Sequence, residues 1–185
     1  MLLADALLGF VLLLIFAMVI TVVMHIFLRV PYVPTSASIA RQMVELADLR
    51  DGESVMDLGA GDGSILRVAK RSRPGIRAEG CEIVPTVWFF GFLRCIGSGV
   101  RLHLRSAFTE DVRGADVIFL FLMPELLQRL LPKFVAELKP GARIVCRTFP
   151  LPGYTPDRVV TVPWLGRDTK VFLYRWRATM PTTSA

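Results

Sequence analysis

Glycines and carboxylates between residues 55 and 65 have the types and spacing of a ligand-binding turn. In VMDLGAGDGSI, Gly59, Gly61 and Gly63 alternate with other residues directly after an apolar run, and Asp57 lies two residues before the first glycine. Residues without a Cβ let the backbone turn sharply and pass close to a ligand, and a helix that begins there presents free amides. The stretch therefore predicts a binding site for a small molecule with a nearby positive charge.

Two kinds of ligand use such a turn, and the neighbouring residues favour one of them. A dinucleotide site needs a third glycine where this chain has Ser64, and a carboxylate at Asp57 would face the pyrophosphate. S-adenosylmethionine has no phosphate and carries a sulfonium and an ammonium group, which suit a carboxylate. Glu82 ends the second predicted strand, where an acid can accept both ribose hydroxyls. The predicted cofactor is therefore S-adenosylmethionine, held by Asp57, Gly59, Gly61, Asp62, Gly63 and Glu82.

Four residues at or near the predicted site have open roles. Asp62 is either a helix N-cap or an ordering contact near the methionine end of the cofactor. Ser106 follows the third predicted strand, where many such enzymes have an acid for the adenine amine. Backbone amides at Ala107 and Phe108 are the expected substitutes for that acid.

These residues need a sheet to position them, and the pattern after residue 53 predicts one. Strands are expected at 54–58, 77–82, 100–104, 115–122 and 143–148, and helices at 63–71, 86–96 and 124–138. RVVTVPWL and TKVFLYRW, joined by GRD, predict a final hairpin. Alternating strands and helices of this kind form a mostly parallel α/β sheet with ligands at its carboxyl edge. The fold class is thus a seven-stranded Rossmann-like sheet, with a first helix from Thr35 or Ser36 to about Leu49.

The N-terminal segment has a different character. Residues 6–28 contain no Asp, Glu, Lys or Arg and would form a helix of roughly 35 Å, long enough to cross a hydrocarbon core of about 30 Å. The start, MLLAD, lacks the basic residues of a cleaved signal peptide. Asp5 precedes the segment and arginines follow it, which predicts an outside N-terminus and a catalytic domain in the cytoplasm or an organellar matrix. The expected parts are an anchor (1–28), a connecting segment with the first helix (29–52) and the domain (53–185).

Composition excludes some functions. Cysteines 81, 95 and 146 have no CxxC spacing and no paired histidine, so no metal site is expected. The formal net charge of +6 could favour anionic lipid or an acidic partner. Aromatic and basic residues do not alternate as in RNA-binding sheets, so nucleic acid is not an expected partner.

With these motifs in view, the chain resembles the class I methyltransferases. It is most similar to the small membrane-anchored protein-lysine methyltransferases related to the mitochondrial enzymes for ATP synthase subunit c and the adenine nucleotide translocase. The resemblance runs from about residue 29 to 176 through PYVPTS, DLGAGDG, FLFLMPELLQRLLPKF, LKPGARIVC and FPLPGYTP. It implies that residues 31–35 fold over the cofactor and shape the substrate entrance. Family members often have DGR where this chain has Gly63-Ser64.

The resemblance also implies a protein substrate with a target lysine, with membrane-embedded proteins among the candidates. Tyr32 and Thr35 in the covering segment, and Pro124 and Glu125 after the fourth strand, are the predicted catalytic residues. Glu125 is equally explained as a first-turn carboxylate that the helix dipole favours. The alternatives are a methyltransferase for a lipid or quinone-like molecule, and a catalytically silent membrane-tethered protein that binds S-adenosylmethionine. Four aromatic residues in helix 86–96 (Trp88, Phe89, Phe90 and Phe92) indicate either an ordinary core helix or one that faces lipid or an apolar substrate.

Overall fold

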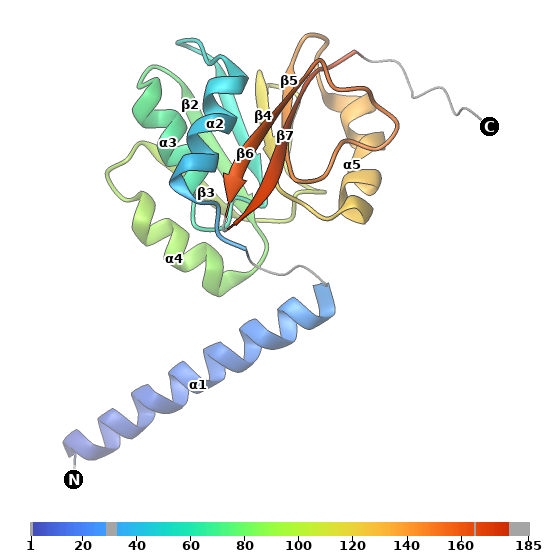
Figure 1. The fold of residues 1–185 in the computed structure, drawn as a ribbon. Coiled ribbons are helices and arrows are strands. Elements are labelled where there is room, and N and C mark those ends of the chain that lie inside the picture. Colours follow the sequence, from blue (N-terminus) through green and yellow to red (C-terminus); the bar gives the residue numbers. More distant parts are fainter. Residues whose placement is uncertain (1, 29–32, 165, 178–185) are drawn as a thin grey trace.

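A long N-terminal helix precedes an α/β domain in the computed structural model, which describes residues 2–28, 33–164 and 166–177 (Figure 1). Helix α1 (Leu2–Leu28) is followed by α2 (Ala37–Ala47), and the sheet then begins. Its strands are β1 (Ser54–Leu58), β2 (Arg77–Glu82), β3 (Val100–Leu104), β4 (Val117–Leu120), β5 (Arg143–Arg147), β6 (Arg158–Trp164) and β7 (Arg167–Arg175). The remaining helices are α3 (Ser64–Ser72), α4 (Pro85–Cys95) and α5 (Pro124–Glu137).

The seven strands form one sheet in the order β3-β2-β1-β4-β5-β7-β6. The pairs from β3 through β5 are parallel, whereas β7 pairs with β5 and β6 in antiparallel fashion. The strand order reverses between β1 and β4, and a ligand site is expected where the carboxyl ends of these strands separate. The predicted seven-stranded Rossmann-like sheet with a C-terminal hairpin is confirmed.

Helices cover both faces of this sheet (Figure 1). Side chains from α2 and α3, with Cys95 from α4, form one apolar core with β1, β2 and β3. The other core contains the buried face of α5, including Leu127, Leu130 and Phe134, together with Trp176 after β7. The burial of both faces explains why β4 is fully buried and entirely apolar.

Local sequence accounts for the ends of several elements. Ser36 caps α2, since its hydroxyl accepts a hydrogen bond from the amide of Ile39 at 3.5 Å. Strand β4 is shorter than the predicted 115–122. At its start the Asp116 carboxylate accepts a hydrogen bond from the Ser54 amide at 2.8 Å, and beyond its end Phe121 and Leu122 line a pocket. The apolar sequence thus extends two residues past the end of β4, because the wall of this pocket, like a buried strand, is made of apolar side chains.

Helix α1 has the length and composition needed to cross a bilayer. Residues Leu3–Thr21 have a mean hydropathy of 2.7, and none of this stretch is buried by the rest of the protein. An N-terminal signal sequence would share these properties. The hydroxyls of Thr21 in α1 and Thr86 in α4 lie 2.7 Å apart, so α1 contacts the domain at the first turn of α4.

Candidate active site

The glycine-rich turn between β1 and α3 is built on backbone geometry that favours glycine. Gly59, Gly61 and Gly63 all have positive φ, at 87°, 56° and 72°. The amides of Gly59 and Ala60 both donate to the carbonyl oxygen of Cys81 at 2.9 Å, which ties the turn to the end of β2. A side chain at Gly63 would also meet the Cys95 sulfur 2.5 Å from its Cβ. The alternating glycines are therefore required by the path of the chain itself.

Glu82 lies at the carboxyl end of β2 and faces the same turn. One of its oxygens accepts a hydrogen bond from the Gly61 amide at 3.1 Å, and the other accepts one from the Val84 amide at 2.8 Å. Both oxygens of the side chain therefore act as acceptors toward backbone amides. Each oxygen has a further lone pair, which hydroxyl donors of a ligand could use.

Asp57 is the most buried acid of the site, with 2% of its surface exposed. No described residue donates a hydrogen bond to its carboxylate. Burial, and then the charges of Glu82 and Asp62, raise the pKa of Asp57 from 3.8 to about 8. A buried carboxylate without a partner is favourable only when a positive charge comes close. The site is therefore prepared for a cation.

Asp62 orders the start of α3 from the residue before the N-cap, so the N-cap alternative for Asp62 is wrong. Its Oδ1 accepts hydrogen bonds from the Ser64 amide at 3.1 Å and from the Ser64 hydroxyl at 2.5 Å, and these order the start of α3. Arg94 of α4 donates to Oδ2 at 2.6 Å. The residue also lines the pocket. The helix N-cap position itself is taken by Gly63.

A pocket of about 390 Å³ opens beside this turn, which is within the usual size range of small-molecule sites. Seven of the eight predicted cofactor residues line it, and Gly63 lies just behind as the N-cap of α3. Apolar residues from the ends of β2, β4 and the adjoining helices complete the wall. The lining residues are Val33, Pro34, Thr35, Asp57, Gly59, Ala60, Gly61, Asp62, Ser64, Ile65, Cys81, Glu82, Ile83, Val84, Val87, Arg105, Ser106, Ala107, Phe108, Phe121, Leu122, Leu126 and Arg129.

Residues 33–35 form part of the pocket wall and are fixed by a buried arginine. Arg147, at the end of β5, donates to the Thr35 hydroxyl at 2.9 Å and lies 3.5 Å from the Pro34 carbonyl oxygen. Its guanidinium also lies over the rings of Phe121 at 4.0 Å and Trp164 at 5.0 Å. Burial lowers the pKa of Arg147 to about 10, so it stays charged at neutral pH.

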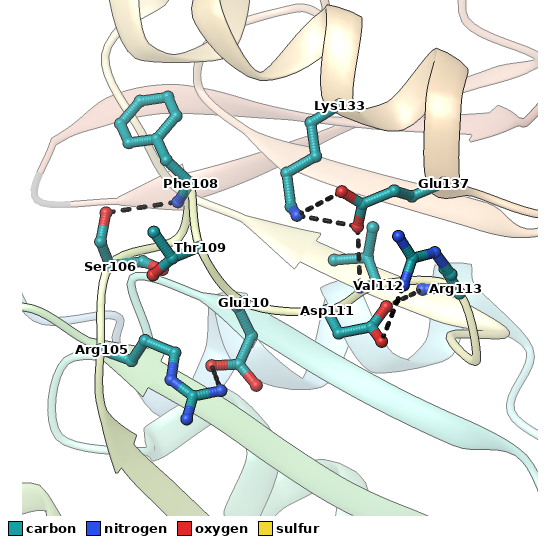
Figure 2. Close-up of polar contacts among 10 residues, drawn as sticks. All are labelled: Arg105, Ser106, Phe108, Thr109, Glu110, Asp111, Val112, Arg113, Lys133 and Glu137. Atoms are coloured by element: carbon teal, nitrogen blue, oxygen red, sulfur yellow. Dashed lines mark hydrogen bonds and ion pairs between the residues drawn. The ribbon is translucent and has the colours of Figure 1, made fainter.

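The loop after β3 carries Ser106, Ala107 and Phe108 and is held by polar contacts (Figure 2). The Ser106 hydroxyl accepts a hydrogen bond from the Phe108 amide at 3.3 Å. Further along the loop, the Glu137 carboxylate of α5 binds Lys133 at 2.8 Å and accepts from the Val112 amide at 3.4 Å. The loop is therefore attached to α5, and the Ser106 hydroxyl is used within the loop.

The predicted catalytic residues occupy different places. Thr35 lies in the pocket wall, whereas Tyr32 lies outside the described residues. Pro124 begins α5, and Glu125 is exposed in its first turn; neither lines the pocket. Arg147 is not among the residues predicted from sequence, although a charged residue at the end of the apolar run RIVCR is a signal that indicates it.

The side chains of the pocket fit S-adenosylmethionine. Three carboxylates surround a glycine turn, and the one at Asp57 has no partner among the described residues, which suits the positive charges of that cofactor. Glu82 has acceptor capacity for ribose hydroxyls, and the loop at 106–108 supplies backbone and an aromatic ring for a base. No basic side chain in the described part of the chain pairs with Asp57, so the positive charge beside this carboxylate would come from the ligand.

Comparisons with known proteins agree with this chemistry. The family described as the ANTKMT methyltransferase domain matches residues 57–158. A protein-lysine N-methyltransferase of Saccharolobus islandicus is 33% identical over 150 residues, which cover 79% of this chain and 93% of that protein. The mouse adenine nucleotide translocase lysine N-methyltransferase is 36% identical over 166 residues, which cover 85% and 68% of the two chains.

A solved structure extends the similarity to the fold. An RNA methyltransferase from Salinibacter ruber, in complex with S-adenosyl-L-homocysteine, has a TM-score of 0.72 and 31% sequence identity, and the match covers 80% of this chain and 97% of that one. The matched family region begins at Asp57 and includes the whole glycine turn and Glu82. The chain belongs to the ANTKMT methyltransferase family and is an S-adenosylmethionine-dependent methyltransferase.

Proposed function

We propose that the protein is a protein-lysine N-methyltransferase that works at a membrane surface, with α1 as its anchor. The observation that carries the substrate class is similarity across the catalytic region to two relatives named for protein lysines, at 33% and 36% identity. In this proposal Asp57, Gly59, Gly61, Asp62, Gly63, Glu82, Ser106 and Ala107 hold the cofactor.

The charge distribution of the pocket supports an amine as the methyl acceptor. The acids belong to β1, β2 and the turn, whereas the wall from β4 and α5 is apolar or basic, with Phe121, Leu122, Leu126 and Arg129. A lysine attacks only as the neutral amine, and an apolar wall with nearby positive charge lowers the pKa of such an amine. The wall thus favours loss of the proton before methyl transfer.

S-adenosylmethionine, when bound, supplies a methyl group on a sulfonium that is already activated for displacement. The protein must align the amine with that methyl group and exclude water. Residues 33–35 cover the pocket, and we assign Thr35 to positioning, because its oxygen already accepts a hydrogen bond from charged Arg147. A hydroxyl oxygen that accepts a hydrogen bond from a cation is a poor base for the proton of a lysine amine. Tyr32, Pro124 and Glu125 remain proposed contributors to catalysis.

The length of α1 and the apolar composition of residues 6–28 support anchoring. The excess of arginines after the helix supports a catalytic domain on the cytoplasmic or matrix side. A lysine close to the membrane surface would then be within reach of the pocket. Membrane proteins are accordingly the first substrates to test.

The test uses the full chain in lipid nanodiscs with S-adenosylmethionine labelled in its methyl group. Membranes, soluble proteins, total lipid and total RNA from the source cell are offered separately, and labelled protein is digested and sequenced by mass spectrometry. We expect label on lysine side chains of membrane proteins. The Asp57→Asn variant serves as the control with a damaged cofactor site.

Each other result has a definite meaning. Label in the lipid fraction would replace the lysine proposal by a lipid or quinone-like substrate. Label in RNA would assign this chain the substrate named for the Salinibacter ruber structure. Tight cofactor binding without label in any fraction would indicate a catalytically silent protein.

A further inference from the structure

Helix α4 presents an apolar face that no described part of the protein covers. Its inward side packs through Gly91 and Cys95, and the Trp88 ring nitrogen donates to the Leu102 carbonyl oxygen at 3.0 Å. The outward side is apolar and exposed, with Phe90 exposed by 64% and Ile96, just after the helix, by 66%. The exposed apolar residues of this face, the α4 face, are Phe89, Phe90, Phe92, Leu93 and Ile96.

The position of α4 beside α1 indicates what covers this face. Figure 1 shows α4 at the side of the domain nearest α1. The contact is made by the hydroxyls of Thr21 and Thr86, which lie 2.7 Å apart. From Thr21 to Leu28, α1 continues for seven residues, or about 10 Å. Helices that lie in a membrane interface bury their apolar faces about 5–10 Å deep. This depth is similar to the distance of Thr21 from the end of α1.

We propose that the α4 face inserts into the lipid bilayer beside α1 and forms a second membrane contact. This inference rests on the proposed anchoring by α1. If α1 spans the bilayer, its contact with Thr86 holds the first turn of α4 at the depth where apolar chains and headgroups meet. Arg94 on the same helix and Arg101 on the edge strand β3 pair with Asp62 and Glu79, and their side chains remain exposed for contact with anionic headgroups.

This contact would also orient the active site. Ile83, Val84 and Val87, at the start of α4, line the cofactor pocket. An anchor helix alone is a single attachment point and does not fix the orientation of the domain. Two contacts with the bilayer, α1 and the α4 face, fix the direction in which the pocket opens relative to the membrane plane.

The test measures lipid contact at single positions in the full chain. Single cysteines are introduced by Phe90→Cys in the α4 face, Leu12→Cys in α1 and Val159→Cys in β6, and each is labelled with an environment-sensitive fluorophore. The three native cysteines are buried, and labelling of the parent chain measures their background. Val159 is a matched control because it is apolar and 47% exposed, yet lies in β6, the strand at the opposite end of the sheet from β3, against which α4 packs. The labelled proteins are reconstituted in vesicles of phosphatidylcholine and phosphatidylglycerol with spin-labelled acyl chains.

We expect the spin-labelled lipid to remove most of the fluorescence at position 90 and at position 12, and little of it at position 159. Strong quenching at position 12 with none at position 90 would overturn the α4 contact while leaving the anchor intact. The absence of quenching at both positions would remove the anchor itself. A buried, unquenched fluorophore at position 90 would mean that protein, such as a second copy of the chain, covers the α4 face, and would equally overturn the proposal.

Discussion

Replacement of Asp57 by asparagine should stabilise the protein and weaken cofactor binding at the same time. The carboxylate is buried without a partner among the described residues, and its pKa is raised from 3.8 to about 8, first by burial and then by Glu82 and Asp62. Its ionisation therefore opposes folding. Asparagine has nearly the same shape and never ionises, so the variant separates the charge from the volume.

The size of the effect follows from the two pKa values. The unfolded chain loses this proton near pH 3.8 and the folded protein near pH 8, so stability falls by up to about 1.4 kcal/mol per pH unit between them. Below pH 3.8 both states hold the proton, and above pH 8 neither does, so the loss is confined to this window. The limit is on the order of 6 kcal/mol over the window, and water that enters the pocket on ionisation reduces it.

The first assay is thermal unfolding of the full chain in detergent micelles between pH 5 and pH 9. Relative to the parent, Asp57→Asn should already gain up to about 1.6 kcal/mol from this linkage at pH 5, and the gain should grow to pH 8 and then stay constant. For a chain of this length each kcal/mol corresponds to roughly 2–4 °C in melting temperature. Asp111→Asn is the matched control, because it makes the same chemical change at an exposed residue of the loop after β3.

The second assay is calorimetry with S-adenosylhomocysteine, whose ammonium group is positively charged. A cation should favour the ionised form of Asp57, so binding below pH 8 should release up to one proton, seen as a heat that depends on the buffer. The asparagine variant should release none from this site and should bind more weakly by about 1.5–3 kcal/mol. Parallel stability curves for parent and Asp57→Asn between pH 5 and pH 8 would refute the reasoning, because Asp57 would then be ionised in the empty pocket.

Three further predictions concern the turn, the cover and the anchor. Gly91→Ala should lower stability and S-adenosylhomocysteine affinity by about 1–3 kcal/mol each, since its Cβ would lie 2.6 Å from the Gly61 carbonyl oxygen; Gly114→Ala, with open space around it, should change neither. Arg147→Met should raise the KM for S-adenosylmethionine without lowering the melting temperature, because Nε and Nη2 are buried without hydrogen bonds. Thr35→Val should lower the melting temperature, because Nη1 would keep only its long contact, at 3.5 Å, with the Pro34 carbonyl oxygen. A reporter at the C-terminus should be cytoplasmic and the chain should resist carbonate extraction; a mature N-terminus near residue 36 would contradict this.

The sequence was sufficient for the part of the site that depends on local pattern. Asp57 and Glu82 end strands that are adjacent in a parallel sheet, so their meeting at the carboxyl edge follows from the fold class. The positive φ values of the three glycines follow in the same way from the tight turn between β1 and α3. These predictions needed only the order of strands and helices.

The rest of the site depends on contacts between distant residues. Arg147 and Thr35 are 112 positions apart, and their hydrogen bond exists only because α2 packs against the face that contains β5. Phe121 and Leu122 have the composition of a buried strand, and their role as pocket wall depends on where β4 separates from its neighbours. The hydrophobic periodicity of a segment predicts which of its faces is buried. It does not predict which distant residue a side chain contacts.

The three surroundings of helix α4 explain why it has more aromatic residues than a buried helix requires. It serves three surfaces at once: Gly91 lies against the glycine turn, Val87 lines the pocket, and Phe90 is directed away from the domain. A helix of 11 residues is rigid over its length, so a force on the outward face is transmitted to the turn that holds the cofactor. Because Gly91 leaves no space between α4 and the turn, α4 cannot tilt inward without displacing Gly61. If the α4 face lies in lipid, membrane attachment and the shape of the cofactor site are therefore coupled through this one helix. Substitutions in the α4 face should then change the affinity for S-adenosylhomocysteine in vesicles more than in detergent.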